Sequence, residues 1–188
     1  MSKLIALVVT ALLCAVLPAA SAATPIVLAE DRWGDVRIER QDGLGPWARQ
    51  SIDLRRLIVT AVDDGIRFEI RLRRVTTGTR FDQFFFIDFT NSEEFGQVHI
   101  RAARMRGEVG LEGAPTPQGF AFCRVTPEVN EARTRLAVVV PLRCVPVDEA
   151  DVEVSVYTTP LDGRGGRVLF SRDGLVVPGR VDLSPATE

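Results

Sequence analysis

The chain has 188 residues, of which 46% are hydrophobic, and it carries a formal net charge of −2. This length suits a single domain with a well-buried core. Lys3 is the only lysine, so the chain beyond the N-terminal segment holds 22 arginines against 25 acidic residues, a net charge near −3. That balance argues against nucleic acid or an anionic membrane surface as a partner.

The first 22 residues have the features of a secretory signal peptide. Lys3 gives a positive start, an apolar run of 14 residues follows from Leu4 to Leu17, and Pro18 ends the run. Residues 20–22 (Ala-Ser-Ala) fit a cleavage site, so we expect cleavage near Ala22 and a secreted mature chain. The run is too short to span a bilayer. Cys14 lies inside it, which argues against a lipid-attachment site, and no later segment is long enough for a membrane span.

The clearest structural pattern is a pair of strands at Leu54–Val62 and Ile66–Arg73. Apolar residues in the second strand alternate with arginine and glutamate, which predicts one face in a core and one in water. Residues 63–65 (Asp-Asp-Gly) tolerate the positive φ of a tight turn. We therefore expect a hairpin whose row of arginines faces solvent.

The next strand, Phe84–Phe89, reads FFFIDF and is apolar on both faces. This is typical of a central strand or of one covered on both sides. Asp88 interrupts it, and we expect this carboxylate to be paired or to lie where the strand leaves the core.

Six further short strands are expected, at residues 97–102, 107–112, 120–125, 135–142, 152–159 and 168–170. The mature chain shows no sustained helical period. Eight or nine strands separated by turns predict an all-β fold, an antiparallel β-sandwich of jelly-roll type. We expect one such domain over residues 24–178 and a flexible C-terminal tail over residues 179–188.

Cys123 and Cys144 are the cysteines that remain after cleavage. An even pair in an oxidising compartment predicts a disulfide, which would close a loop of about 20 residues and contribute roughly 3 kcal/mol. A hairpin with residues 126–134 as its loop would bring the two thiols near each other. A zinc site would need more ligands than two thiols and a single histidine provide.

Signatures of enzymes are largely missing. His99 is the only histidine, and no nucleophile elbow, P-loop or dinucleotide fingerprint accompanies it. We expect His99 to be an exposed strand residue; the alternative is a haem ligand paired with Met105. We predict no catalysis, and a small hydrolase that uses two carboxylates is the alternative.

An acidic turn opens the folded part of the chain. In DRWGDVRIERQDG, residues 31–43, Asp31 and Asp35 bracket a Trp-Gly pair. The turn could aim both carboxylates at one calcium ion, and Asp88 could supply a third oxygen. Solvated turn aspartates are the alternative.

The two tryptophans, Trp33 and Trp47, both precede the first clear strand. A tryptophan in a loop can stack on a sugar ring, because the C–H face of the ring meets the π face of the indole. The alternative for Trp47 is that the Gly45-Pro46-Trp47 loop packs against the core.

Three stretches carry a resemblance: DRWGDV (31–36), SIDLRRLIV (51–59) and VDDGIRFEIRLR (62–73). They resemble uncharacterised secreted proteins of GC-rich actinobacteria. More distantly, residues 31 to about 88 are similar to carbohydrate-binding family-nine and DOMON-type sandwich domains. That resemblance implies a noncatalytic sandwich that binds calcium, sugar or, in some members, haem.

The leader, the strand pattern and the missing catalytic set together predict an exported, noncatalytic binding or structural module of the bacterial exterior. The sequence does not identify the partner; a carbohydrate or another component of the cell envelope is the candidate, and calcium is the candidate cofactor. A carbohydrate-binding module with a calcium site is the alternative function.

Overall fold

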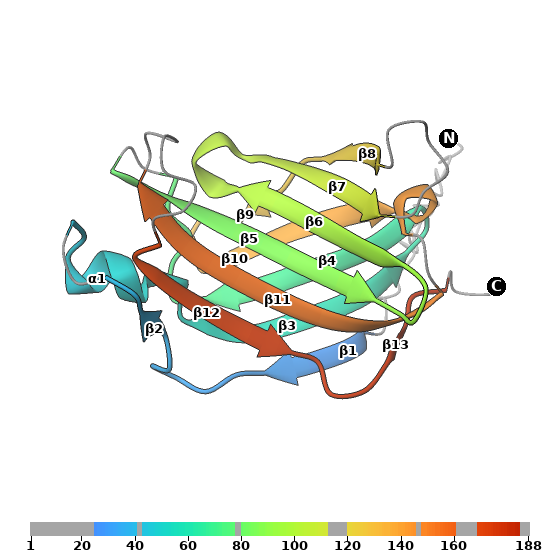
Figure 1. The fold of residues 1–188 in the computed structure, drawn as a ribbon, viewed down its shortest axis with the longest axis horizontal. Helices are drawn as coiled ribbons and strands as arrows, with labels where there is room; N and C mark the ends of the chain where they lie inside the picture. The colour runs from blue at the N-terminus through green and yellow to red at the C-terminus, as the bar shows by residue number, and fades with distance from the viewer. Residues whose placement is uncertain are drawn as a thin grey trace, which may run out of the picture.

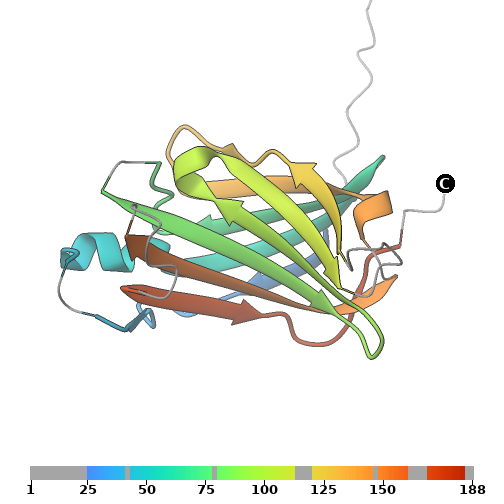
Figure 2. The ribbon, with the colours of Figure 1, turned by 45° about the horizontal axis from the view of Figure 1, so that its top comes forward.

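The computed structural model describes residues 25–40, 43–77, 80–112, 120–145, 148–160 and 169–184. The expected signal peptide and residues 185–188 of the expected tail lie outside these ranges. The described chain forms two antiparallel sheets packed face to face, which confirms the predicted all-β sandwich (Figures 1 and 2).

One sheet has five strands and the other has eight. The five-stranded sheet has the order β1 (Pro25–Glu30), β3 (Leu54–Val62), β4 (Gly65–Leu72), β10 (Arg135–Pro141) and β9 (Glu128–Val129). The eight-stranded sheet has the order β2 (Arg37–Ile38), β12 (Ser171–Val176), β11 (Glu149–Pro160), β5 (Phe81–Thr90), β6 (Phe95–Arg101), β7 (Arg106–Glu112) and β8 (Phe120–Val125), with β13 (Val181–Asp182) paired to β11. Figure 1 shows the eight-stranded sheet in front of the other.

The predicted hairpin is β3 and β4. Val62 pairs with Gly65 across the two-residue turn Asp63-Asp64. The glycine is the first residue of β4 rather than part of the turn, and no side chain fits there, because a Cβ at Gly65 would lie 2.4 Å from the Val140 carbonyl oxygen of β10. The alternation is as expected: Ile66, Phe68, Ile70 and Leu72 are at most 2% exposed.

The core lies between the two sheets. Phe68 of β4 and Phe89 of β5 stack across it with ring centroids 6.5 Å apart. Phe85 and Ile87 of β5 are also fully buried, so one face of the FFFIDF run belongs to the core. The strand is central, as predicted, between β11 and β6.

The predicted disulfide between Cys123 and Cys144 is present, with its Cα atoms 6.2 Å apart. The expected hairpin around it is wrong. β8, which carries Cys123, pairs with β7, while β10 pairs with β4 and β9. Cys144 follows β10 in a 3₁₀ turn, η3 (Leu142–Cys144), so the disulfide joins the eight-stranded sheet to the five-stranded sheet.

Helical structure is confined to short pieces among the described residues: α1 (Pro46–Arg49), η1 (Gln50–Ile52), η2 (Ala102–Arg104) and η3. At the C-terminal end, β13 pairs with the start of β11, and Val181 and Leu183 are each 1% exposed. Residues 181–184, which the sequence pattern placed in a tail, therefore contribute two side chains to the core. No helix of the described part is long and apolar enough to cross a membrane.

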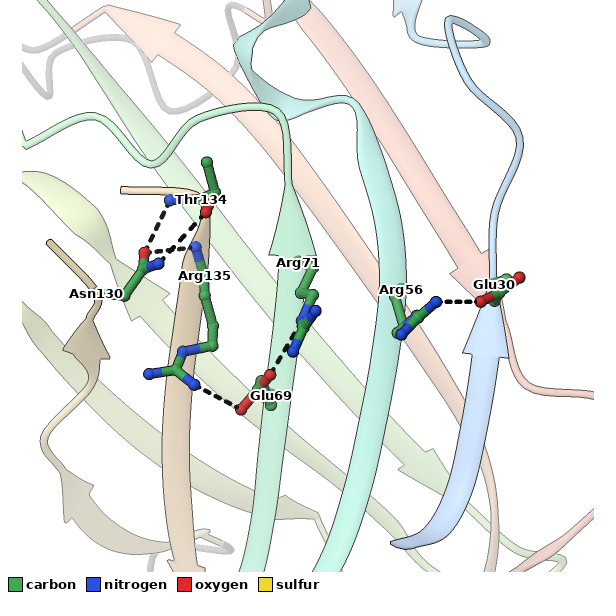
Figure 3. A network of polar contacts seen from close by, with 7 residues as sticks. All are labelled: Glu30, Arg56, Glu69, Arg71, Asn130, Thr134 and Arg135. Atoms are coloured by element: carbon green, nitrogen blue, oxygen red, sulfur yellow. Dashed lines mark hydrogen bonds and ion pairs between the residues drawn. The ribbon is translucent and has the colours of Figure 1, made fainter. Parts of the chain in front are cut away.

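The outer face of the five-stranded sheet is a surface of ion pairs (Figure 3). Glu69 of β4 lies between Arg71 and Arg135, at 3.1 and 3.3 Å, and Arg56 of β3 pairs with Glu30 of β1. This is the arginine row that the alternation predicted. Arg67 and Arg71 of this row pair with carboxylates of the same sheet, and Arg73 donates to the side-chain amide oxygen of Gln50.

Candidate functional site

The outer face of the eight-stranded sheet is hollowed by a groove of about 570 Å³. Side chains of β5, β6 and β11, which lie side by side in Figure 1, form its floor. We call it the aromatic groove, after Phe84, Phe86, His99 and Tyr157 in its lining. Its volume falls within the usual range for small-molecule sites.

Strand register brings these side chains together. Phe86 of β5 is opposite His99 of β6 on one side and Ser155 of β11 on the other. Phe84 is opposite Arg101 and Tyr157 in the same way. Because alternate residues of a strand share a face, the groove uses the positions of FFFIDF that the core does not.

The rings of the aromatic groove pack on one another. The imidazole of His99 is nearly parallel to the ring of Phe86, with centroids 4.7 Å apart, and lies 5.3 Å from that of Phe84. Tyr157 meets Phe86 edge to face at 5.6 Å. Such packing holds the floor in place before any ligand arrives, which lowers the entropic cost of binding.

His99 is partly buried rather than exposed as the sequence predicted. Burial, together with the charge of Arg101, lowers the pKa of the imidazole below its usual value, so the ring is neutral at pH 7. Its Nε2 atom is buried and has no hydrogen-bond partner in the described part of the chain. Met105, the alternative haem partner, does not contribute to the groove lining.

Two carboxylates anchor the polar rim of the groove. Asp82 is fully buried and accepts hydrogen bonds from Nε and Nη2 of Arg101 at 2.9 and 2.7 Å. Asp88 accepts a hydrogen bond from the Gln97 amide at 2.7 Å, and burial raises the pKa of its carboxyl above the usual value. Asp88 therefore has the partner that its place in an apolar strand required.

Asp88 does not join Asp31 and Asp35. The third carboxylate beside them is Asp173 of β12, and one oxygen from each of the three lies within 4.8 Å of the others. We call Asp31, Asp35 and Asp173 the acidic triad. Sequence reasoning missed Asp173 because 138 or more residues separate it from the other two, as their numbers show, and no local pattern marks it.

The acidic triad concentrates negative charge at the junction of the two sheets. Asp173 accepts a hydrogen bond from the backbone N–H of Leu54 in β3 at 2.7 Å. Burial and the nearby Asp31 and Asp35 raise its pKa to about 6. Burial also raises the pKa of Asp31, whose Oδ2 atom has no hydrogen-bond partner among the described residues. These three residues could hold a metal ion.

Trp33 and Trp47 are 81% and 51% exposed. The Arg55 guanidinium lies 3.1 Å from the centre of the Trp33 ring, and Trp33 lines a cavity of about 520 Å³ at the start of β3. Trp47 lies in α1, with Arg74 at 5.6 Å, and does not line that cavity. In the loop that the sequence offered as an alternative for core packing, Ala48 is buried, whereas half of the Trp47 side chain is exposed.

A further hollow of about 310 Å³ lies between the acidic triad and the aromatic groove. Asp35 and Asp173 line it at one side, and it shares Ser155 and Tyr157 with the groove. The outer face of this sheet therefore carries a row of adjoining hollows that leads from the acidic triad across β11 to the rings of β5 and β6. We call this row the track.

The chain matches no family model, curated protein or solved structure. The resemblance to secreted sandwich proteins therefore stays a hypothesis.

Proposed function

We propose that this protein is an exported, noncatalytic binding module of the bacterial exterior and that the aromatic groove is its ligand site. The observation that carries the proposal is the row of half-buried rings on an outward sheet face, with polar groups at its edges. Apolar rings toward solvent on a central strand lower solubility without adding to the core, so a ligand is a physical reason for their presence. The disulfide is consistent with an oxidising, extracytoplasmic location.

A saccharide is the ligand class that suits this lining best. Sugar rings have apolar C–H faces, which favour aromatic side chains, and hydroxyl groups, which need hydrogen-bond partners. The groove offers both, with the rings of Phe86 and Tyr157 beside the polar side chains of Ser155, Asp88 and Gln97. The hollow next to the groove extends the track and suits an oligosaccharide rather than a single sugar.

The carboxylates of the groove support binding rather than hydrolysis. Glycoside hydrolysis normally needs two carboxyl groups on either side of the scissile bond. Among the described lining residues Asp88 is the one carboxylate, and it is held by Gln97. Asp82, behind the groove, is held by Arg101.

A panel of immobilised polysaccharides tests the proposal. We expect the protein to be retained on at least one of them, and Phe86→Ala to weaken the retention by about tenfold or more, the effect of losing one ring–sugar contact. Leu28→Ala is the matched control, because Leu28 is a 55% exposed apolar residue of the other sheet. No retention on any polysaccharide, or equal loss in both variants, would contradict the proposal.

We propose, as a second function, that the acidic triad binds calcium. Asp31 and Asp35 raise the pKa of Asp173, so a cation among the three carboxylates would relieve their repulsion, and oxygen ligands at this spacing suit Ca²⁺. If the dissociation constant is about 1 mM and the calcium concentration is about ten times higher, calcium would add about 1.4 kcal/mol to the free energy of unfolding. We expect the melting temperature to rise by about 3–6 °C over that in chelator.

Asp35→Asn supplies the control for calcium, because Asp35 is exposed and its loss should leave the fold intact. The variant should lose the calcium-dependent rise in melting temperature. Identical melting curves of the wild-type protein in calcium and in chelator would end this proposal.

A further inference from the structure

A third hollow adjoins the aromatic groove on the side away from the acidic triad. It measures about 250 Å³ and shares His99 and Arg101 with the groove. Arg104 and Arg106 line its far side. We call Arg104 and Arg106 the arginine subsite.

The fold holds the arginine subsite beside the rings. Arg106 of β7 is opposite Arg101 of β6, so its side chain leaves the same face as those of the groove. Arg104 lies in η2, the turn between β6 and β7. The backbone N–H of Ala103 donates to Oδ1 of the buried Asp82 at 3.1 Å, which ties this turn to β5.

The cations of the arginine subsite have no carboxylate of their own, as is also true of the exposed Arg180, but they differ from Arg180 in lining a hollow that adjoins the aromatic groove. Arg101 is paired with Asp82, whereas Arg104 and Arg106 are exposed and form no ion pair or hydrogen bond with any residue that the structure describes. Glu108 is the acidic residue of this hollow. Two unpaired guanidinium groups against one carboxylate leave a local positive charge on a chain whose net charge is negative.

The track therefore has a charge polarity. Three carboxylates lie at its β12 end, the neutral rings lie at its centre, and two free arginines lie at its β7 end. Arg37 and Arg172 also line the hollow at the β12 end, but both pair with Glu39, so the unpaired arginines that can attract an anionic group lie at the β7 end. Guanidinium groups bind carboxylates through paired, charge-assisted hydrogen bonds, which are stronger than neutral ones.

We propose that the saccharide bound in the aromatic groove is acidic, with a uronic acid whose ring lies beside Phe84 and His99 and whose carboxylate binds the arginine subsite. This inference rests on the proposed function and adds the class of sugar to it. It also assigns a role to Arg104 and Arg106, which no packing or ion pair in the described chain explains.

The test is electrophoresis of the folded protein through gels that contain one polysaccharide each, with chelator present. Polygalacturonate, alginate and hyaluronan are the acidic polymers, and galactan, mannan and a soluble cellulose derivative are the neutral ones. We expect retardation by at least one acidic polymer, weakened at high salt because the contact is exposed. The double variant Arg104→Ala/Arg106→Ala should weaken it by about tenfold or more, because it removes both charged groups that hold the carboxylate.

Arg180→Ala is the matched control, because Arg180 is an exposed arginine in the turn before β13. It should migrate as the wild-type protein does. Retardation by neutral polymers alone, with the double variant unaffected, would overturn the acidic class and leave the groove as a saccharide site. Retardation that Arg180→Ala weakens equally would reduce the effect to general charge and overturn the subsite. Retardation by no polymer would contradict both proposals.

Discussion

The two outer faces of the sandwich are built by the same alternation of residues, but they differ in which polar and charged groups lack a partner. On the five-stranded sheet, Glu69 forms ion pairs with both Arg71 and Arg135, and Arg56 pairs with Glu30 (Figure 3). On the eight-stranded sheet, rings face outward, Nε2 of His99 has no described partner, and Arg104 and Arg106 have no described carboxylate. The comparison shows that a face whose polar groups bond to one another is complete in contact with water. A face whose polar groups lack such partners suits a ligand.

The sharpest test of this difference uses two neighbours on β5. Phe85 is fully buried in the core, whereas Phe86 faces the groove. Phe85→Ala should lower the free energy of unfolding by about 3–5 kcal/mol, the cost of a large cavity. Phe86→Ala should lower it by only about 1 kcal/mol, through lost cross-strand contacts, and should abolish most ligand binding. Urea unfolding measures both, and equal costs would remove the distinction between the faces.

The disulfide between the sheets gives the next largest effect. Replacing both Cys123 and Cys144 by alanine opens a loop of 21 residues and should cost about 3 kcal/mol of stability. The strands that form the groove carry neither cysteine, so ligand affinity should persist below the unfolding transition. Unchanged urea midpoints for the variant and the wild-type protein would contradict the stabilising role.

The acidic triad makes stability depend on pH. The pKa of Asp173 is raised to about 6 in the fold from its ordinary 3.8, so the folded state holds this proton more tightly than the unfolded state does. Its contribution is present at acid pH and is lost as the pH rises from about 4 through 6. The contribution of His99 to stability changes with pH in the opposite direction, because the fold lowers the pKa of its imidazole.

Asp173→Asn separates the two effects. In calcium-free buffer, the stability of the wild-type protein relative to the variant should fall between pH 4 and pH 7. Melting temperatures measured across that range for both proteins test the sign. A difference that stays constant, or that grows with pH, would show that Asp173 does not titrate as described.

The smallest effect is expected on the paired face. Glu69→Gln weakens two partly exposed ion pairs and should cost about 0.5–1 kcal/mol, less at high salt. Binding in the groove should not change, because Glu69 lies on the opposite sheet. A weaker affinity for the ligand in this variant would show that the two faces do not act independently.

The sequence predicted the features that depend on patterns of residues close together in the chain, such as the alternation of apolar and polar residues along a strand. The alternation in residues 66–73 identified the buried and the solvent-facing side of β4, and two cysteines in a chain with the features of a signal peptide indicated the disulfide. The apolar run FFFIDF indicated a central strand. It did not indicate whether protein or ligand would cover the second face, because periodicity places a residue on a face without naming what lies opposite.

The remaining features depend on partners distant in the chain. Asp173 reaches Asp31 and Asp35 only because β12 lies at the side of the sheet next to the start of β3, where its carboxylate meets the Leu54 N–H. Cys123 lies on one sheet and Cys144 on the other because β8 pairs with β7 rather than with β10. Strand pairing of this kind is set by the packing of the whole core, which no short motif records.

The central claim, that a saccharide binds the outer face of the eight-stranded sheet, has two natural reporters. Tyr157 is the only tyrosine and His99 the only histidine of the chain, and both line the aromatic groove. We predict that their ring signals, in protein isotopically labelled at tyrosine, histidine and tryptophan, shift saturably as uronic acid oligosaccharides are added, while the indole signal of Trp47 stays in place. Oligosaccharide binding detected by calorimetry with both ring signals unmoved would contradict the claim.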